Sequence, residues 1–293
     1  MLQSSNRRSE MVLGYTSVMP VIIVIFVVIG IPFINALYLS LTDKTVGAQA
    51  HFIGFENYRE IFTDPVYWKV LKNTFIYFMT DVFFKLVIGM IFALTLNQAF
   101  FGRSIVRVLF LVPWAISGLV SALTWKWMYN DSYGIINQLL LDTGLIENPV
   151  AWLSGPKIAL VSVIIVNIWR GIPFFLFSIL GGLQTIDRQM YEAAKIDGAG
   201  PIRQFFSVTI PSISSVLVIT TMLSSIWTFN DFENIYLITG GGPLYNSAVI
   251  SVYTYETAFL QNDMGKSLSV AGSIIPILLV LMFFMTRKLA KEE

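Results

Sequence analysis

The chain contains no cysteine, a single histidine and few charged residues. Without cysteine it has no disulfide framework, no thiolate metal site and no cysteine nucleophile. The histidine, His51, lies in a polar loop, and a metal site needs several converging ligands, so no metal site is predicted. Charged residues make up 13% of the 293 residues and the net charge is +1, so no basic field indicates a nucleic-acid partner.

Hydrophobic residues, by contrast, make up 55% of the chain, and the mean hydropathy is +0.70. Such a chain cannot cover its apolar surface with polar groups in water, so its composition predicts a membrane protein. A helix of about 20 apolar residues crosses a bilayer. We therefore expect an all-α membrane protein with about six transmembrane helices, near residues 12–41, 73–96, 105–128, 157–183, 210–232 and 266–286.

The first of these segments follows Arg7 and Arg8 and could be mistaken for a signal peptide. Its apolar run is about twice the ~7–15 residues of a signal-peptide core, and no small-residue cleavage site follows it. A retained membrane anchor is therefore predicted, with an interfacial or tilted part, because Pro20 and Pro32 both interrupt the hydrogen-bond ladder of its helix.

Positive charges predict the orientation. If the N-terminus is cytoplasmic, ten Lys and Arg residues lie inside and seven lie outside, which agrees with the positive-inside rule. The inner ones are Arg7, Arg8, Arg103, Arg107, Arg188, Lys195, Arg203, Arg287, Lys288 and Lys291; the outer ones are Lys44, Arg59, Lys69, Lys72, Lys126, Lys157 and Lys266. Both termini are then expected in the cytoplasm.

Span boundaries divide the chain into three parts. Residues 1–72 hold the first span and the first outer loop, residues 73–286 form a core with five spans, and residues 287–293 form a cytoplasmic tail. The outer loops are rich in aromatic side chains, for which two interpretations stay open: a belt at the lipid headgroups, or contact with a partner protein.

The cytoplasmic loop 184–211, between the fourth and fifth spans, carries a spaced motif. Glu192, Ala193 and Ala194 are followed by Gly198, and Pro211 comes thirteen residues after that glycine. This pattern resembles the E-A-A-x-x-x-G motif of permease subunits in bacterial ABC importers. A short connecting helix is the simpler alternative, because Ala and Glu are good helix formers, but the motif spacing between two spans favours a docking helix.

The same loop has helix boundary signals. Asp187 can cap a first helix, and Gly198 and Gly200 can adopt the positive φ that ends it. Pro201 suits the first turn of a second helix, which is expected to stop before Pro211.

The resemblance covers most of the chain from Phe52 onward. The segment 183–211, Trp169 and Pro173 before it, and the T-x-G-G-P-like run 238–243 are similar to the carbohydrate branch of these permeases, which includes the maltose and glycerol-phosphate permeases. The resemblance implies the fold of a type I ABC importer permease in the bacterial inner membrane, with the 184–211 loop as its coupling helix. The residues that it assigns to ATPase coupling are Glu192, Ala193, Ala194, Asp197, Gly198 and Pro211.

The resemblance also implies a function and a set of partners. The chain would form half of the translocation pathway for a sugar, oligosaccharide or sugar derivative. Its partners would be a second, homologous permease subunit, two ATPase subunits and an extracytoplasmic binding protein. ATP and Mg²⁺ would reside on the ATPase, with no cofactor on this chain; Gly265-Lys266-Ser267 is no P-loop, because Leu260 stands where that motif needs glycine.

Polar residues within the spans are candidates for the substrate path, because an ionisable group at bilayer depth costs at least ~2.5–3.5 kcal/mol. Asp81 and Lys85, one helical turn apart, favour a structural pair over a transport site. Arg170 has no acid one turn away, so another helix, with Asp231 as the nearest candidate, or water or substrate must meet its charge. The candidates for the path are Trp169, Arg170, Trp227, Asn230, Asp231 and Tyr236. An alternative stays open at the end of the fifth span, where Asp231 and Glu233 would simply mark the exit from the bilayer.

Two other classes of membrane protein are weighed against this interpretation. A secondary transporter usually has more than six spans with repeated halves, and no clear repeat is visible. A membrane-embedded enzyme needs clustered histidines, cysteines or paired carboxylates at depth, of which the chain has almost none.

Overall fold

The computed structural model describes the backbone of residues 2–289 and the side chains of residues 14–283, 286 and 287. The side chains of Arg7, Arg8 and Lys288, and the whole of Lys291, which enter the predicted orientation, lie outside the described residues, as does most of the predicted tail 287–293. The chain forms two compact units: residues 1–63 with 254–273, and residues 64–253 with 274–293. The division at residues 72 and 286 stays a prediction.

The first unit begins with the predicted anchor. It comprises α1 (Leu2–Ile25), a π-helical turn (Phe26–Gly30) and α2 (Ile31–Leu39), and its described part, Gly14–Leu39, is long and apolar enough to cross a membrane. The helix α1 continues through Pro20, and the interfacial or tilted part stays a prediction. Before Pro32 the helix takes the wider π turn, which accommodates a residue without an N–H donor.

The rest of the first unit is a compact bundle of short segments. It contains α3 (Glu56–Thr63), a π-helical turn (Glu256–Leu260) and the beginning of α15 (Met264–Leu289). The Asn57 side chain donates to the carbonyls of Ser40 (2.9 Å) and Thr42 (2.8 Å), and Lys266 pairs with Glu60 at 2.5 Å. These contacts hold the loop after α2 against the start of α15.

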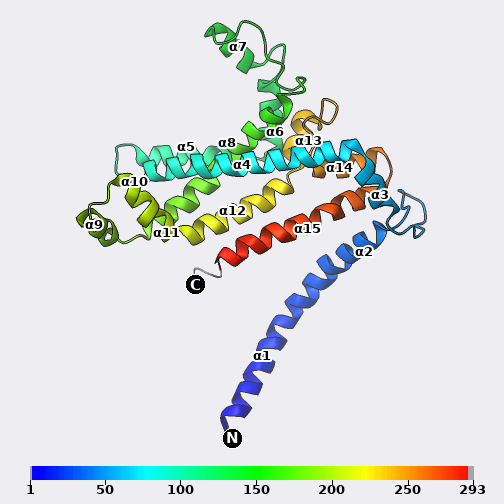
Figure 1. Cartoon of the computed structure of the whole chain (residues 1–293), viewed down its shortest axis with the longest axis horizontal. Helices are drawn as coiled ribbons and strands as arrows, with labels where there is room; N and C mark the ends of the chain where they lie inside the picture. Colours follow the sequence, from blue (N-terminus) through cyan, green and yellow to red (C-terminus); the bar gives the residue numbers. More distant parts are fainter. Residues whose placement is uncertain (1, 290–293) are drawn as a thin grey trace. The chain divides into compact units, whose positions relative to one another are not determined.

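In the second unit two long helices lie side by side (Figure 1). They are α4 (Pro65–Asn97) and α8 (Ala159–Gln184). The second span is predicted to start near residue 73, but α4 begins two turns earlier. Asp64 caps this earlier start, because its side chain accepts a hydrogen bond of 2.8 Å from the Val66 N–H. Gly89 lets the backbones approach, since a Cβ there would lie 2.5 Å from the Phe175 Cβ.

Two predicted spans are bent helix pairs. The third consists of α5 (Arg103–Ala115) and α6 (Gly118–Met128), which meet at 93° because Ile116 and Ser117 have extended backbone between them. The fifth begins with a helix over Pro201–Ser212, which meets α12 (Ser214–Phe229) at 69°. The described residues therefore contain four helices long and apolar enough to cross a membrane, or up to six candidate spans if each bent pair counts as one. Hydropathy does not register such bends.

The remaining helices of this unit are α7 (Ile135–Asp142), α9 (Arg188–Ile196), α13 (Glu233–Thr239) and α14 (Ile250–Tyr255). The described residues contain no β-strand beyond two isolated bridges. Two apolar clusters form the core: one around Phe175, Leu176 and Ile179 of α8, the other around Val163 of α8 and Ile235 of α13. The fold is thus all-α, as predicted, with α8 at its centre.

Candidate functional site

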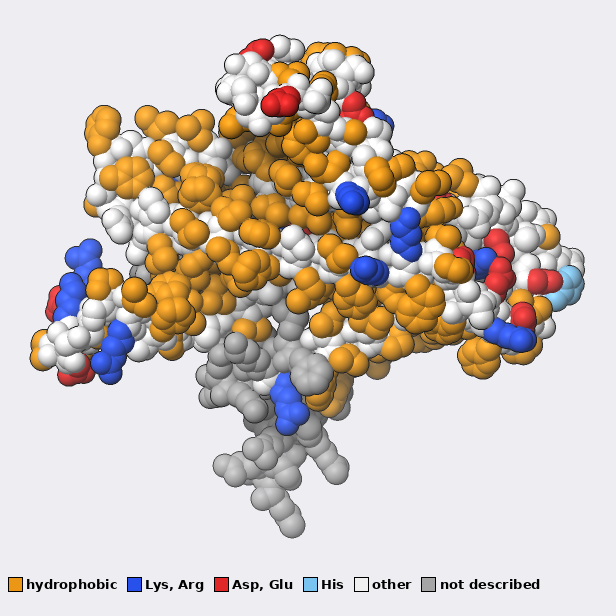
Figure 2. Space-filling model, turned by 45° about the horizontal axis from the view of Figure 1, so that its top comes forward, with side chains coloured by type: hydrophobic (Ala, Val, Ile, Leu, Met, Phe, Trp, Pro, Cys, Tyr) orange, Lys and Arg blue, Asp and Glu red, His pale blue; other side chains and the backbone are white. Residues whose placement is uncertain are grey.

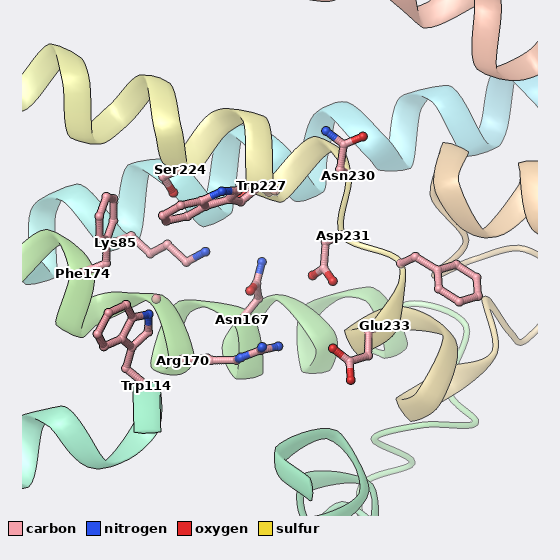
Figure 3. Close-up of a pocket in the computed structure, with 13 residues that line it drawn as sticks. Lys85, Trp114, Asn167, Arg170, Phe174, Ser224, Trp227, Asn230, Asp231 and Glu233 are labelled. Atoms are coloured by element: carbon pink, nitrogen blue, oxygen red, sulfur yellow. The ribbon is translucent and has the colours of Figure 1, made fainter. Parts of the chain in front are cut away.

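A cavity of about 630 Å³ opens where α4, α5, α8 and α12 converge (Figure 3). Its lining is a mixture of charged, amide, hydroxyl and aromatic side chains: Lys85, Trp114, Asn167, Arg170, Gly171, Phe174, Ser224, Trp227, Thr228, Asn230, Asp231, Phe232 and Glu233. This combination suits a hydroxyl-rich ligand, because hydroxyls need donors and acceptors while sugar rings have apolar faces.

Lys85 belongs to a buried ion pair at the edge of the cavity. Its ammonium lies 2.6 Å from the Asp81 carboxylate, which also accepts a hydrogen bond of 2.9 Å from the Thr228 hydroxyl. Gly171 makes room for the lysine, since a Cβ there would lie 2.7 Å from its Cδ. The predicted pairing is present, and the same lysine faces the cavity.

Asp231 is held by hydrogen bonds inside the protein. The Tyr77 hydroxyl donates to its carboxylate, and the Asn234 N–H donates to the other oxygen at 3.3 Å. The Ser251 hydroxyl donates to its carbonyl at 2.7 Å. The structure does not show the alternative in which Asp231 ties Arg170, because no acid among the described residues lies within 4.0 Å of that guanidinium.

Arg170 instead faces Glu233 across the backbone of Gly118, and Figure 3 shows the two side chains pointing toward one another. A Cβ on Gly118 would lie 2.8 and 2.9 Å from the terminal nitrogens of Arg170 and would also contact Glu233 Oε2. Gly118 is the first residue of α6, so the bend after α5 places it between these two groups.

The aromatic candidates separate into two groups. Trp227 lines the cavity and packs on Phe174, with ring centroids 4.8 Å apart. Trp169 does not line it; that side chain lies against Trp125 and borders a smaller apolar pocket of about 220 Å³. Tyr236 also lies outside the cavity lining and stacks on Phe232 at 4.8 Å.

The structure thus brings four of the six predicted path residues together: Arg170, Trp227, Asn230 and Asp231. Sequence reasoning did not nominate Trp114, Phe174, Ser224 or Thr228 for the path, it left Glu233 between sugar recognition and an exit from the bilayer, and it assigned Lys85 to a structural pair. Helical spacing could have found some of them, since Phe174 stands one turn after Arg170 and Ser224 one turn before Trp227 and Thr228. No pattern signals Trp114, because the bend after α5 determines where it lies.

The second candidate site is the loop between α8 and α12, where α9 stands apart from the helix packing (Figure 1). Asp187 caps α9 as predicted, accepting from the Gln189 N–H at 2.9 Å. Gly198 ends it with φ +78°, and the N–H groups of Gly198 and Ala199 donate to the carbonyls of Lys195 and Ala194. This double hydrogen bond is a Schellman motif, which needs a left-handed residue at the glycine position.

Two predicted details of this loop are wrong. Gly200 has φ −69° and belongs to the start of the next helix rather than to the end of α9. The second helix also passes through Pro211 to Ser212, because a π-helical turn over Phe205–Thr209, in which the Ile210 N–H donates to Phe205, precedes the proline. The wider turn accommodates the missing donor.

The residues predicted to couple to an ATPase lie on the surface. Glu192, Ala193, Asp197 and Gly198 are exposed, and Ala194 is half-buried. Large apolar side chains are exposed beside them, including Ile196 (87%) and Ile202 (77%). Figure 2 shows charged side chains gathered at this end of the molecule among hydrophobic ones. Small residues, an acid and exposed apolar side chains together form a surface that suits a protein partner.

Residues 85–289, which include the entire cavity lining and α9, match the family model described as "Binding-protein-dependent transport system inner membrane component". The chain belongs to this family. It is therefore a transport subunit of the inner membrane.

Curated relatives of this transport component match along nearly their whole length. The trehalose/maltose transport system permease protein MalF of Thermococcus litoralis is 35% identical, over 96% of this chain and 94% of its own. The sulfoquinovosyl glycerol transport system permease protein SmoG of Agrobacterium fabrum is 33% identical, over 86% and 82%. The inner membrane ABC transporter permease protein YcjO of Escherichia coli is 31% identical, over 96% and 95%.

A solved structure shares the fold of this transport component. The crystal structure of a bacterial ABC transporter involved in the import of the acidic polysaccharide alginate aligns with a TM-score of 0.80 and 22% identity, covering 98% of this chain and 97% of that one. The chain therefore has the fold of a type I ABC importer permease.

Proposed function

We propose that this chain is the membrane-spanning subunit of a binding-protein-dependent ABC importer and forms half of the translocation pathway for a carbohydrate. The cavity carries this proposal: its amides, hydroxyls and charged groups can hydrogen-bond to sugar hydroxyls, and its aromatic rings can pack on sugar rings. Relatives named for trehalose and maltose and for sulfoquinovosyl glycerol support a carbohydrate as the substrate.

The chain is a transport subunit and hydrolyses no ATP itself in this proposal. Two separate ATPase subunits hold ATP and Mg²⁺, and this chain holds no cofactor. Its α9 segment, with Glu192, Ala193, Ala194, Asp197 and Gly198, docks on an ATPase, and Pro211 lies where the following helix enters the membrane. The exposed apolar and small residues of this segment support the docking role.

The other partners follow from the binding-protein-dependent family. A second, homologous permease subunit completes the pathway, and an extracytoplasmic binding protein delivers the substrate. A similar transporter has been crystallised with an alginate pentasaccharide-bound periplasmic protein, which supports the latter. Both termini and α9 lie in the cytoplasm, and the loops 42–72, 129–156 and 233–265 face the other side.

Copurification tests the proposal. The wild-type chain, expressed with its neighbouring genes, should bring down an ATPase in stoichiometric amount, and ATP hydrolysis should rise with loaded binding protein. A secondary transporter would bring down none. Glu192→Lys inverts a charge on the docking surface, so it should leave the chain in the membrane while uncoupling ATP hydrolysis from uptake.

The matched control is Glu147→Lys, which reverses a glutamate that is also exposed, in the loop after α7. It should behave as wild type. Normal uptake and normal stimulation of the ATPase in Glu192→Lys would remove α9 from the coupling role. Loss of the protein from the membrane would instead assign Glu192 a structural role.

A further inference from the structure

Four ionisable side chains line the cavity, and two of them are occupied by other protein groups. Lys85 pairs with Asp81 at 2.6 Å, and the Asp231 carboxylate accepts hydrogen bonds from Tyr77 and Asn234. Among the described residues, Arg170 and Glu233 have neither a side-chain hydrogen bond nor an ion pair. These two groups are therefore the charged groups available to a ligand.

The distance between Arg170 and Glu233 is bounded by Gly118. Terminal nitrogens of Arg170 lie 2.8 and 2.9 Å from the Cβ position of Gly118, and Glu233 Oε2 lies closer still to the same point. The guanidinium and the carboxylate are thus more than 4.0 Å but no more than about 5.3 Å apart. One oxygen atom that hydrogen-bonds to both groups, at about 2.7–2.9 Å each, can bridge this separation from the side away from Gly118, because the Cβ position itself is at bonding distance from the Gly118 backbone.

The chemistry of the pair selects which oxygen fits. A guanidinium only donates hydrogen bonds and an ionised carboxylate only accepts them, so the bridging group must accept from one and donate to the other. A hydroxyl does both. The carboxylate of an acidic sugar would accept hydrogen bonds from Arg170 but would be repelled by Glu233. An ammonium group would pair with Glu233 but would be repelled by Arg170.

We propose that Arg170 and Glu233 form a hydroxyl-binding pair that selects an uncharged part of the substrate at this point of the pathway. The proposal rests on the proposed function and names the chemical class that this site takes: a neutral, hydroxyl-bearing sugar unit. Two cations and two acids line the cavity, so it offers an anionic sugar no net positive charge. Trp114 and Trp227 line the same cavity and can pack on the sugar ring.

Matched sugars test the pair directly. The assembled transporter, in nanodiscs, is titrated with methyl glycosides of glucose, galactose and mannose and with the corresponding methyl uronides, and tryptophan fluorescence reports binding in the cavity. The three pairs differ only by a hydroxymethyl group against a carboxylate. At least one neutral glycoside should bind with an affinity about tenfold or more above that of its uronide. In the uronide, one charge-assisted hydrogen bond to Glu233 is replaced by repulsion between two carboxylates.

Glu233→Gln is the deciding variant. Its amide can still accept a hydrogen bond from the hydroxyl but carries no charge, so the affinity for the neutral glycoside should change by less than about threefold while its preference over the uronide falls toward one. A preference that is unchanged in Glu233→Gln overturns the proposal. So does the absence of binding by all six sugars to a transporter that still copurifies with its ATPase, an outcome that leaves the proposed function standing.

Gly118→Ala provides a second measurement. Its methyl group would stand between the two side chains, and because the three atoms nearest to it are the ends of flexible side chains, these can move aside and the chain should still fold. Binding of the neutral glycoside should then fall by about tenfold or more. The control is Gly181→Ala on α8, where a methyl group would meet nothing within 4 Å, and it should bind as wild type. Equal binding in the two alanine variants contradicts the proposed gap.

Discussion

The buried pair of Asp81 and Lys85 allows a quantitative prediction. The side chains are 0% and 6% exposed, and one oxygen of Asp81 has no hydrogen-bond partner among the described residues. Lys85→Met would leave the Asp81 charge with only the Thr228 hydroxyl as a partner. Removal of one partner of a buried ion pair typically costs about 3–5 kcal/mol, because the other charge stays buried without compensation.

The double variant Asp81→Asn/Lys85→Met should recover most of that loss. Asparagine keeps an oxygen that accepts a hydrogen bond from Thr228, and methionine has nearly the volume of the lysine stem. Neither position of the pair then carries a charge. We expect this variant to lie within about 1–2 kcal/mol of wild type. The two substitutions are then strongly non-additive, as expected for residues in direct contact.

The assay is the apparent thermal stability of the assembled transporter, followed by size-exclusion chromatography, together with uptake. A stable double variant with wild-type uptake would assign the pair to structure alone. A stable double variant without uptake would show that Lys85, which faces the cavity, also contacts the substrate. The reasoning would be refuted if Lys85→Met cost less than about 1 kcal/mol, or if the double variant were less stable than either single variant.

Three further predictions concern the backbone and the orientation. Gly89→Ala should destabilise the transporter by about 1–3 kcal/mol, because its methyl group would lie 2.5 Å from the Phe175 Cβ. Gly181→Ala should not destabilise it, since a methyl group there meets nothing within 4 Å. Equal melting temperatures for the two variants would contradict the close approach of α4 and α8. Gly198→Val should reduce stimulation of the ATPase by loaded binding protein more than Gly198→Asn does, because asparagine tolerates positive φ and valine does not. A cysteine at Lys195 should react with an impermeant maleimide only in inside-out vesicles, and labelling in intact cells would reverse the predicted orientation.

Local signals in the sequence predicted the fold well. Long apolar runs mark each membrane helix, and the cap at Asp187 and the positive φ of Gly198 depend on neighbouring residues alone. The spaced motif around Glu192 identified a loop whose helix, turn and second helix are all present. These features are predictable because their causes lie within a few residues of chain.

The cavity was less predictable, because its lining depends on how helices face one another. Trp169 and Arg170 are neighbours in sequence, yet successive helical side chains point about 100° apart, and only Arg170 faces the cavity. Arg170 faces Glu233, whereas the sequence left Asp231, water and substrate open as its partners; the bend between α5 and α6 places Gly118 between the two side chains. Hydropathy contains no term for such a bend.

The contact between the Tyr191 hydroxyl and Thr209 Oγ1, 3.0 Å apart, has a mechanical consequence. Tyr191 lies on α9, next to Glu192, and Thr209 lies in the π-helical turn before Pro211. The contact therefore ties α9 to the helix over Pro201–Ser212 close to the 69° bend into α12. Because α12 carries Trp227 and Thr228, the shortest bonded path from α9 to the cavity wall runs through this bend.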